Sequence, residues 1–182
     1  MRKIFLIFFI FLFSTSHLLG NDNIIKSLKE GDKLVFIRHA LAPGNGDPEN
    51  FDINICSTQR NLNSVGIEQS KKIGSIFKIN KIKIDEIYSS EWCRCKDTAA
   101  YAFKNFKTFN ALNSFYDIKF SSNEEKQIKD LTNFIKKMDS RNNVIFVTHY
   151  VVIDAILNIG TSSGEIVVTD KNLNIIGSID TL

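Results

Sequence analysis

The sequence predicts an α/β domain, a three-layer α/β/α sandwich with a mostly parallel central sheet. Short apolar runs of strand length alternate along the chain with longer segments that have helical periodicity. Such alternation requires crossover helices, which cover both faces of a parallel sheet. Three of the apolar runs are followed directly by polar and charged residues. In parallel sheets a ligand binds outside the carboxyl ends of the strands, so these residues mark the expected site.

Residues 1–20 have the pattern of a secretory signal peptide. Arg2 and Lys3 precede an unbroken apolar run over residues 4–13, and small and polar residues follow it. The apolar run is shorter than the roughly 20 residues that span a bilayer. An uncleaved membrane anchor is the alternative interpretation of the same residues.

Cleavage of this segment would leave one domain over residues 21–182. Ser16 and Gly20 both satisfy the small-residue requirement of a cleavage site. The shortened chain carries 21 basic and 20 acidic residues, because Arg2 and Lys3 are lost, and its net charge is +1. This balance does not provide the clustered positive charge that nucleic-acid binding requires. We therefore expect an exported, periplasmic protein with no nucleic-acid partner and no stable membrane span after cleavage; the sequence does not define its oligomeric state.

The first half of the domain alternates helix and strand around one long loop. The loop contains both prolines of the chain, and loops of this length in compact domains are usually functional. The amphipathic helix that follows it is expected to bury Val65, Ile73, Ile76 and Phe77. The predicted elements are a helix over Ile24–Lys29 with Asp22 as N-cap, a buried strand over Lys33–Ile37, the loop over Ala40–Asn63 and the helix over Ser64–Phe77.

The second half repeats the alternation and ends in two strands joined by a turn. Its predicted strands are Ile84–Tyr88, Lys107–Ala111, Asn143–Val147, Gly164–Asp170 and Asn172–Ser178. Its predicted helices are Glu91–Phe103, Asn123–Met138 and Val151–Leu157.

The two histidines of the domain both lie at the carboxyl end of a predicted strand. His39 follows Arg38 after the first strand, His149 follows the strand over Asn143–Val147, and the strand between them leads to Arg94. A single histidine at a strand end is more often a hydrogen-bonded structural residue. Two at equivalent places, one of them preceded by arginine, indicate a functional site.

Arg38, His39, Arg94 and His149 together suit the binding and transfer of a phosphoryl group. Guanidinium groups offer planar, permanently charged donors that match phosphate oxygens. A neutral imidazole beside them can attack phosphorus, and a second imidazole can stabilise the charge that develops in the transition state. Because these cationic side chains supply the charge stabilisation, we expect no metal and no cofactor. The expected partner is a small phosphorylated substrate or a phosphorylated envelope component.

Four ordered segments resemble the signatures of the histidine phosphatase (phosphoglycerate mutase-like) superfamily. Together they extend over about residues 33–150, and they are similar to a small exported bacterial branch of it. The resemblance implies that His39 is the nucleophile and that Arg38, Arg94 and His149 hold the phosphoryl group. The segments are Leu34–Ala40 with its Arg-His dipeptide, Leu62-x-x-x-Gly66-x-x-Gln69, Tyr88–Ala99 with its Ser-Ser and Arg-x-x-x-Thr-Ala spacing, and Val144–His149.

The same resemblance suggests further site residues. Arg60 lies between the nucleophile and the next helix and could reach substrate, although a solvated loop arginine is the alternative. Asn113 is the second candidate for substrate binding. Many family members carry a general-acid glutamate where this sequence has Ser114. Asp117 is therefore the first candidate for protonating the leaving group, and Glu124 and Glu165 are the others.

These observations predict an exported phosphomonoesterase that works through a phosphohistidine intermediate on His39. Within the enzyme class, the alternative is a mutase or phosphotransferase. From a different class, the alternative is a non-catalytic phosphate- or glycan-binding domain of the same fold. The sequence alone does not identify the natural substrate.

Three cysteines follow the predicted signal peptide, and an exported protein can form disulfides. In the family's pattern the residue after the conserved arginine packs into the core, which makes Cys95 the expected buried thiol. Cys56 and Cys93 are then the better candidates for a bond, which would fasten the long loop beside the phosphate pocket. Three reduced thiols that fill core space are the alternative.

Overall fold

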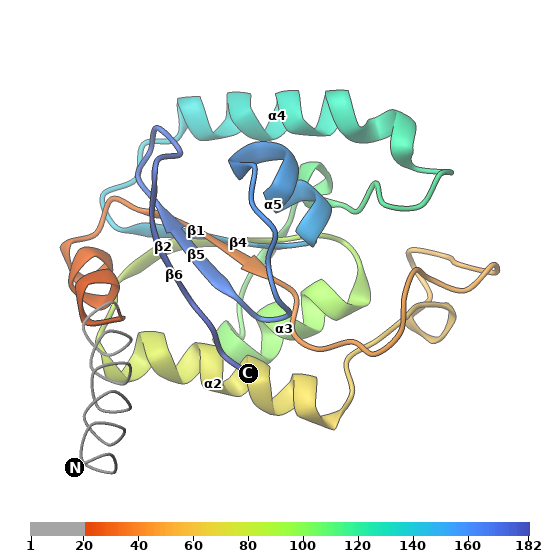
Figure 1. Cartoon of the computed structure of the whole chain (residues 1–182), viewed down its shortest axis with the longest axis horizontal. Coiled ribbons are helices and arrows are strands. Elements are labelled where there is room, and N and C mark those ends of the chain that lie inside the picture. Colours follow the sequence, from red (N-terminus) through yellow and green to blue (C-terminus); the bar gives the residue numbers. More distant parts are fainter. Residues whose placement is uncertain (1–20) are drawn as a thin grey trace, which may run out of the picture.

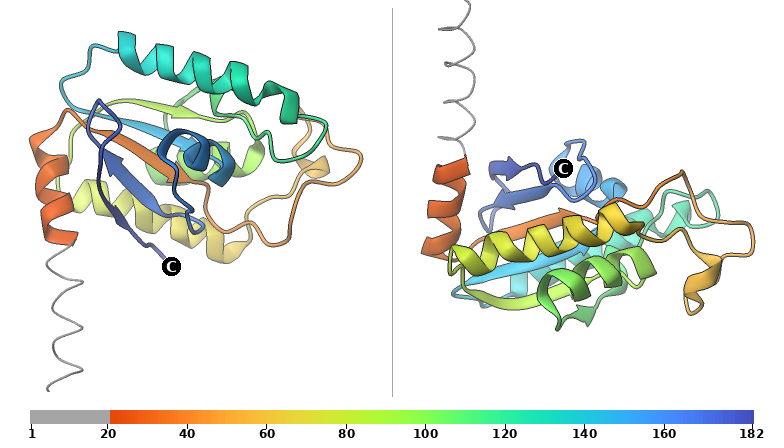
Figure 2. Two further views of the ribbon diagram at one scale, coloured as in Figure 1. Left: turned by 45° about the horizontal axis from the view of Figure 1, so that its top comes forward. Right: turned by 90° about the horizontal axis from the view of Figure 1, so that it is seen from below.

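The computed structural model describes residues 21–182, so the predicted signal peptide over residues 1–20 lies outside the described residues. The described chain forms one six-stranded sheet between two layers of helices (Figures 1 and 2). The strands are β1 (Leu34–Arg38), β2 (Ile84–Ser89), β3 (Lys107–Thr108), β4 (Asn143–Thr148), β5 (Ile166–Thr169) and β6 (Ile175–Ile179). Residues 21–30 form a helix, and the other α-helices are α2 (Ser64–Ile79), α3 (Cys93–Phe103), α4 (Glu124–Lys137) and α5 (Tyr150–Leu157). Three short 3-10 helices of the described chain are η1 (Cys56–Thr58), η2 (Asn110–Leu112) and η3 (Ser121–Asn123).

The strand order is β3-β2-β4-β1-β5-β6. The first four strands are parallel, whereas β5 and β6 pair antiparallel at one side of the sheet. The mostly parallel α/β/α sandwich predicted from the sequence is thus confirmed, and the two antiparallel pairings make the sheet a mixed one. β1 and β4 lie in the middle, and their residues are almost all buried. The carboxyl ends of β1, β2 and β4 therefore meet at one edge of the sheet.

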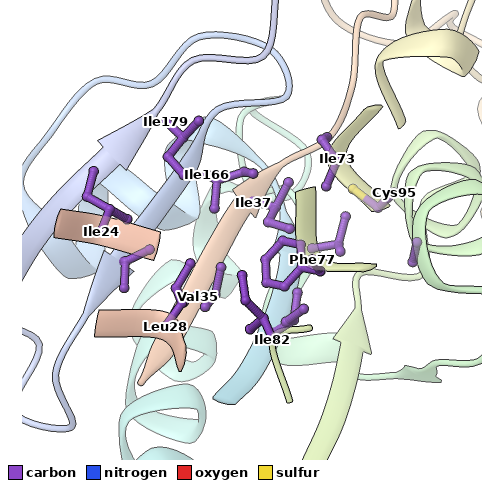
Figure 3. Close-up of a cluster of buried hydrophobic side chains, with 14 of the residues drawn as sticks. Ile24, Leu28, Val35, Ile37, Ile73, Phe77, Ile82, Cys95, Ile166 and Ile179 are labelled. Atoms are coloured by element: carbon purple, nitrogen blue, oxygen red, sulfur yellow. The ribbon is translucent and has the colours of Figure 1, made fainter. Parts of the chain in front are cut away.

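Two hydrophobic clusters, one on each face, hold the layers together. One packs the residue 21–30 helix, α2 and α3 against alternate residues of the central strands (Figure 3). The other packs α4, α5 and η2 against the opposite face. Val35 and Ile37 of β1 point into the first cluster, and Leu34 and Phe36 point into the second. This alternation is the period of two that a strand buried on both faces requires. Within residues 21–182, no helix combines the length and the apolar character needed to cross a bilayer.

The start of α2 corrects one predicted core residue. Val65 is 51% exposed, while Ile73 and Phe77 are buried as predicted. The buried position of the first turn belongs instead to Gly66, where an added Cβ would lie 2.1 Å from the carbonyl oxygen of Leu41. Only glycine permits this close approach, which brings the chain that leaves β1 against α2.

Several element boundaries also differ from the prediction. Residues 21–30 are all helical, so Asp22 lies within the helix and is not its N-cap. β3 has two residues because β2, its only neighbour in the sheet, ends at Ser89, opposite Thr108. β6 begins at Ile175, since the carboxylate of Asp170 accepts hydrogen bonds from the backbone of Asn172 and Asn174 and fixes a turn there.

Candidate active site

The ends of three strands bring the predicted residues together. Arg38 ends β1 and pairs in register with Thr148, which ends β4. The His39 N–H then donates to Thr148 O at 2.9 Å, so the next residue of each strand end is also aligned. His39 and His149 therefore lie side by side, with ring centroids 5.4 Å apart. Arg94 reaches the same place from the first turn of α3, which follows β2.

A small enclosed pocket of about 60 Å³ occupies this place. His39, Arg94 and His149 are each at most 3% exposed. A cavity of this size holds only a few water molecules, so the space suits a small tetrahedral oxyanion. Its lining includes the four predicted residues and Arg60: Arg38, His39, Arg60, Arg94 and His149.

One hydrogen bond defines the protonation of His39. Its Nδ1 lies 2.8 Å from Ala40 O. A carbonyl oxygen can only accept, so Nδ1 carries the proton and the neutral ring keeps a lone pair on Nε2. Ala40 is held in turn, because its N–H donates to the Thr98 hydroxyl at 3.0 Å. His39 is thus oriented as a nucleophile through Nε2.

His149 is oriented by a chain of buried hydrogen bonds. Its Nε2 lies 3.0 Å from Ser90 Oγ, which donates to Asn113 Oδ1 at 3.0 Å. Asn113 Oδ1 also accepts from the Glu91 N–H at 2.9 Å, and its amide nitrogen donates to Glu91 Oε2 at 2.7 Å. Because the Ser90 proton is directed to Asn113, Ser90 Oγ accepts from His149 Nε2–H. The opposite nitrogen, Nδ1, lies 3.5 Å from Arg94 Nη2.

Arg94 forms an ion pair with Asp47, a residue of the long loop. The two Arg94–Asp47 contacts measure 2.7 and 3.2 Å. Asp47 also accepts hydrogen bonds from the Arg60 N–H at 3.0 Å and from the Trp92 indole at 3.1 Å. Burial alone would raise the pKa of Asp47, but these donors and the charge of Arg94 outweigh burial and hold it below its ordinary value. Asp47 thus positions Arg94 and joins the loop to α3.

Backbone carbonyl groups hold the other two arginines of the pocket. Arg38 donates to Thr161 O and lies over the Tyr150 ring, 5.2 Å from its centroid. Arg60 donates to Gly46 O at 2.8 Å and to Ala42 O. The pocket lining has three guanidinium groups against the carboxylates of Asp47 and Asp117, so these side chains leave a net positive charge that suits a phosphate anion. Within the described residues, the buried Nε groups of Arg38 and Arg94 have no hydrogen-bond partner.

Burial and the arginines keep both histidines neutral. The pKa of His39 is held well below its ordinary value by burial first and by the charge of Arg94 next. The pKa of His149 is lowered in the same way by burial, Arg94 and His39. A neutral His39 is the form that can attack phosphorus.

These pKa shifts predict that the free protein loses stability as the pH falls below about 6.5. The unfolded chain binds protons on both histidines there, and the folded chain does not, so the free energy of unfolding decreases by about 1.4 kcal/mol per pH unit for each histidine. Urea unfolding at pH 7.5 and 5.5, in a buffer free of phosphate, measures the loss. The variant His39→Asn/His149→Asn should show a smaller loss. Asp47 does not contribute in this range, because its lowered pKa costs stability only below its ordinary value near 4. An equal loss in wild type and variant would contradict the assignment.

The three general-acid candidates lie in different places. Asp117 lines the pocket, its side chain is 35% exposed, and Lys119 Nζ lies 3.8 Å from its carboxylate. Glu124 begins α4 and lines a different depression. Glu165 accepts from the Ser162 N–H and is not part of the pocket lining. Asp117 is therefore the candidate that the structure places at the site.

The structure also separates the two predicted substrate-binding residues. Arg60 lines the pocket, whereas Asn113 does not and instead holds Ser90. Sequence reasoning missed the contacts of Asp47, although its position in Gly44-x-Gly46-Asp47-Pro48 of the long loop was a visible signal. It also missed the aromatic residues of the lining: Trp92, Tyr116, Phe120 and Tyr150. Within residues 21–182, no group of three or more His, Cys, Asp or Glu side chains is arranged to hold a metal ion.

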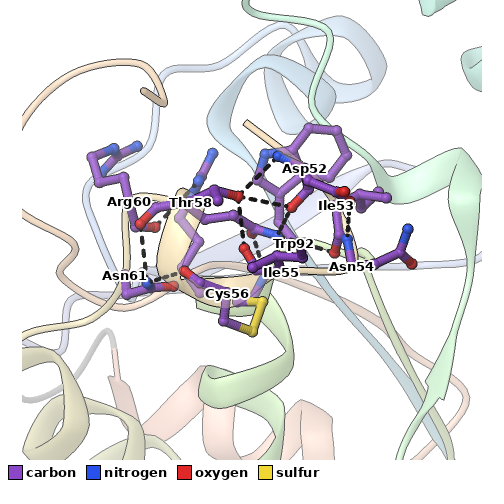
Figure 4. Close-up of a disulfide and its surroundings, with 12 residues drawn as sticks. Asp52, Ile53, Asn54, Ile55, Cys56, Thr58, Arg60, Asn61 and Trp92 are labelled. Carbon is purple, nitrogen blue, oxygen red and sulfur yellow. Dashed lines mark hydrogen bonds between the residues drawn. A yellow bond between two sulfur atoms is a disulfide. The ribbon is translucent and has the colours of Figure 1, made fainter. Parts of the chain in front are cut away.

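A disulfide joins Cys56 of η1 to Cys93 at the start of α3, which is the better candidate pair of the sequence analysis and not its alternative of three reduced thiols. Cys95 is a buried free thiol. Figure 4 shows the disulfide at Cys56 and its surroundings. Next to the disulfide, the side-chain amide nitrogen of Gln59 donates to Asp52 O and Ile53 O, and the amide oxygen of Gln59 accepts from the Cys93 N–H at 2.9 Å. The disulfide and these hydrogen bonds fasten the long loop next to Arg94.

A sequence profile of the histidine phosphatase superfamily (branch 1) matches residues 34–137, which is more than half of the chain. The chain belongs to this family. The match begins at β1 and ends with α4, so it includes His39, Arg60 and Arg94. No curated protein matches the chain.

Solved structures of histidine phosphatases share the fold. The protein histidine phosphatase SixA complexed with tungstate superposes with a TM-score of 0.59 at 14% identity, over 82% of this chain and 97% of that chain. A SixA protein from Agrobacterium tumefaciens gives 0.59 at 18% identity, over 82% and 99%. A phosphoglycerate mutase from Thermus thermophilus gives 0.58 at 12% identity, over 81% and 98%. At such identities the likeness concerns the fold.

Proposed function

We propose that this histidine phosphatase is an exported phosphomonoesterase that transfers the phosphoryl group of its substrate to His39. The observation that carries the proposal is the state of His39: its Nδ1 proton is directed to Ala40 O, and its free Nε2 belongs to a pocket with three guanidinium groups. This combination provides both a nucleophile and charge stabilisation for phosphoryl transfer. Tungstate, a tetrahedral oxyanion like phosphate, is bound by the related SixA structure.

The proposed reaction has two steps. His39 Nε2 attacks phosphorus and the P–O bond of the ester breaks, while Asp117 at the pocket lining protonates the leaving oxygen. Water then attacks the phosphohistidine and gives a proton to the Asp117 carboxylate, the P–N bond breaks and inorganic phosphate leaves. His149 is neutral in the free protein, but a phosphate dianion favours its protonation on Nδ1, which then donates to a phosphoryl oxygen. Ser90 remains the acceptor for its Nε2–H.

Export is the second part of the proposal. Residues 1–20 have the pattern of a signal peptide. The Cys56–Cys93 disulfide supports export, because disulfides persist in oxidising compartments and are rare in the cytosol. N-terminal sequencing of the protein from a periplasmic fraction would test this. We expect a start close after Ser16 or Gly20, and an intact Met1 would contradict cleavage.

The test of the activity uses residues 21–182 and 4-nitrophenyl phosphate. We expect release of nitrophenol with and without a chelator, since the arginines supply the charge stabilisation. No turnover would favour the non-catalytic phosphate-binding alternative. Loss of activity with the chelator and its recovery with a divalent metal would contradict the mechanism.

The hydrogen bonds that orient His149 predict the effect of a substitution at Asn113. In Asn113→Leu the Ser90 hydroxyl loses its acceptor, so it no longer favours the doubly protonated His149 of the substrate complex. We expect kcat to fall about 5-fold with little change in KM, since one such hydrogen bond contributes about 1 kcal/mol. Steady-state kinetics as a function of pH measures the effect.

A matched pair of substitutions separates positioning from simple loss of structure. Asn113→Asp alone places a second carboxylate opposite that of Glu91, so the kcat of this variant should be reduced. Asn113→Asp with Glu91→Gln restores one donor and one acceptor at this contact and should recover most of kcat. If Asn113→Leu retains wild-type kcat across the pH range, Asn113 does not orient His149.

A further inference from the structure

We infer that a cleft beside the phosphate pocket binds the leaving group of the substrate and that this group is an uncharged aromatic ring. The inference rests on the proposed function for the phosphate pocket. That pocket, at about 60 Å³, accommodates the phosphoryl group alone. The rest of the substrate must therefore lie outside it.

The cleft has the size and the position for such a group. Its volume is about 570 Å³, within the range of ligand sites of roughly 300–1,000 Å³. It meets the phosphate pocket at Trp92, Ser114 and Phe120, which line both. Two other depressions of the described surface, one along α4 and one beside β2 and β3, share no residue with the phosphate pocket.

Three aromatic rings form an apolar wall of the cleft. Phe51 stacks on Trp92 with centroids 5.1 Å apart, and Phe120 meets both rings edge to face at 5.6 and 5.5 Å. Trp92 is 3% exposed, so it supports the wall, while Phe51 and Phe120 are only partly buried and present accessible surface. Aromatic rings prefer offset-stacked or edge-to-face neighbours, and a planar ring of the substrate would add a fourth member to this arrangement.

Charged side chains of both signs lie around the wall, one lysine and two carboxylates. Lys119 Nζ lies 5.2 Å from the Phe51 centroid and 5.1 Å from that of Phe120. Glu49 and Asp52 line the same cleft with opposite charge. The side-chain amide nitrogen of Gln127, which also lines the cleft, already donates to Asn110 O and Asn113 O. A neutral ring suits this wall, because the two carboxylates would repel an anionic group and Lys119 already occupies the place over the rings where a cationic group would bind.

The single tryptophan of the chain gives the experiment a direct signal. Trp92 is the only tryptophan in the sequence, so a nitroaryl ligand in the cleft should quench the fluorescence of one known residue. The probe is 4-nitrobenzylphosphonate, which cannot be hydrolysed at its P–C bond, and methylphosphonate is measured by competition against it. We expect the aryl phosphonate to bind about 10-fold or more tightly than methylphosphonate.

Phe51→Leu/Lys119→Met removes one ring and the ammonium group while keeping apolar volume, and neither residue lines the phosphate pocket. We expect this variant to reduce the preference for the aryl phosphonate to about 2-fold or less. The preference compares two phosphonates of equal charge, so an effect of the lost Lys119 charge beside Asp117 on phosphonate binding in general cancels from it. Ile118→Ala is the control, because Ile118 belongs to the same segment, is 90% exposed and lines neither space. It should retain the wild-type preference.

The outcomes separate the cleft from the proposed activity. Equal binding of the two phosphonates by wild type, or a preference that survives in the double variant, overturns the inference even if phosphatase activity is present. A preference that the double variant loses supports the cleft even if no turnover is found, because binding does not require hydrolysis.

Discussion

His39→Asn is expected to reduce kcat for 4-nitrophenyl phosphate by about 10³-fold or more, because it removes the nitrogen proposed to accept the phosphoryl group. The asparagine amide can still donate to Ala40 O, so the backbone after β1 keeps its hydrogen bond. His149→Ala should cost less, about 10²-fold, since it removes transition-state stabilisation and leaves the nucleophile. Steady-state kinetics of the purified variants measures both effects.

Chemical trapping provides the control for this prediction. Quenching wild type during turnover of a ³²P-labelled aryl phosphate should leave an acid-labile, base-stable phosphoryl group on the protein, and peptide mapping should place it at His39. The variant should bind phosphate but form no such adduct. If His39→Asn folds normally and hydrolyses the ester as fast as wild type, a different group attacks phosphorus.

The placement of the paired histidines could be predicted from sequence because it depends on local patterns. An apolar run gives a buried strand, parallel neighbours end at one edge, and the residues after Leu34–Arg38 and Asn143–Thr148 must therefore meet. Arg94 follows the same logic through β2 and the first turn of α3.

The contacts of the long loop could not be predicted in this way. Asp47 binds Arg94 across 47 positions of sequence, and no periodicity indicates where an irregular segment folds back. Asn113 shows the same limit, because the sequence places it near the site but does not reveal that its amide faces Ser90 and Glu91 and not the pocket. Val65 was misplaced because helical spacing alone does not show that Leu41 packs against the first turn of α2 at Gly66.

Breaking the Cys56–Cys93 disulfide is expected to have the largest effect on stability. The bond links residues 37 positions apart, and closing a loop of that length in the unfolded chain corresponds to about 3–4 kcal/mol. Cys56→Ser should lower the free energy of unfolding by this amount. It should also lower kcat/KM, because the loop that carries Asp47 and Arg60 is no longer tied to the start of α3. Urea unfolding and ester hydrolysis measure the two effects.

Two comparisons distinguish the bond from the side chains that form it. Cys56→Ser/Cys93→Ala should cost little more than Cys56→Ser, since both lose the same cross-link. A reductant should destabilise wild type and leave the double variant unchanged. Thiol–disulfide exchange with Cys95 is not expected to disturb this comparison. Burial raises the pKa of Cys95 to about 12, so it remains a thiol and does not attack the disulfide near neutral pH. Thiol counting in denaturant should give one free thiol before reduction and three after it. If reduced wild type with three free thiols unfolds at the same urea concentration as the oxidised protein, the disulfide does not stabilise the fold.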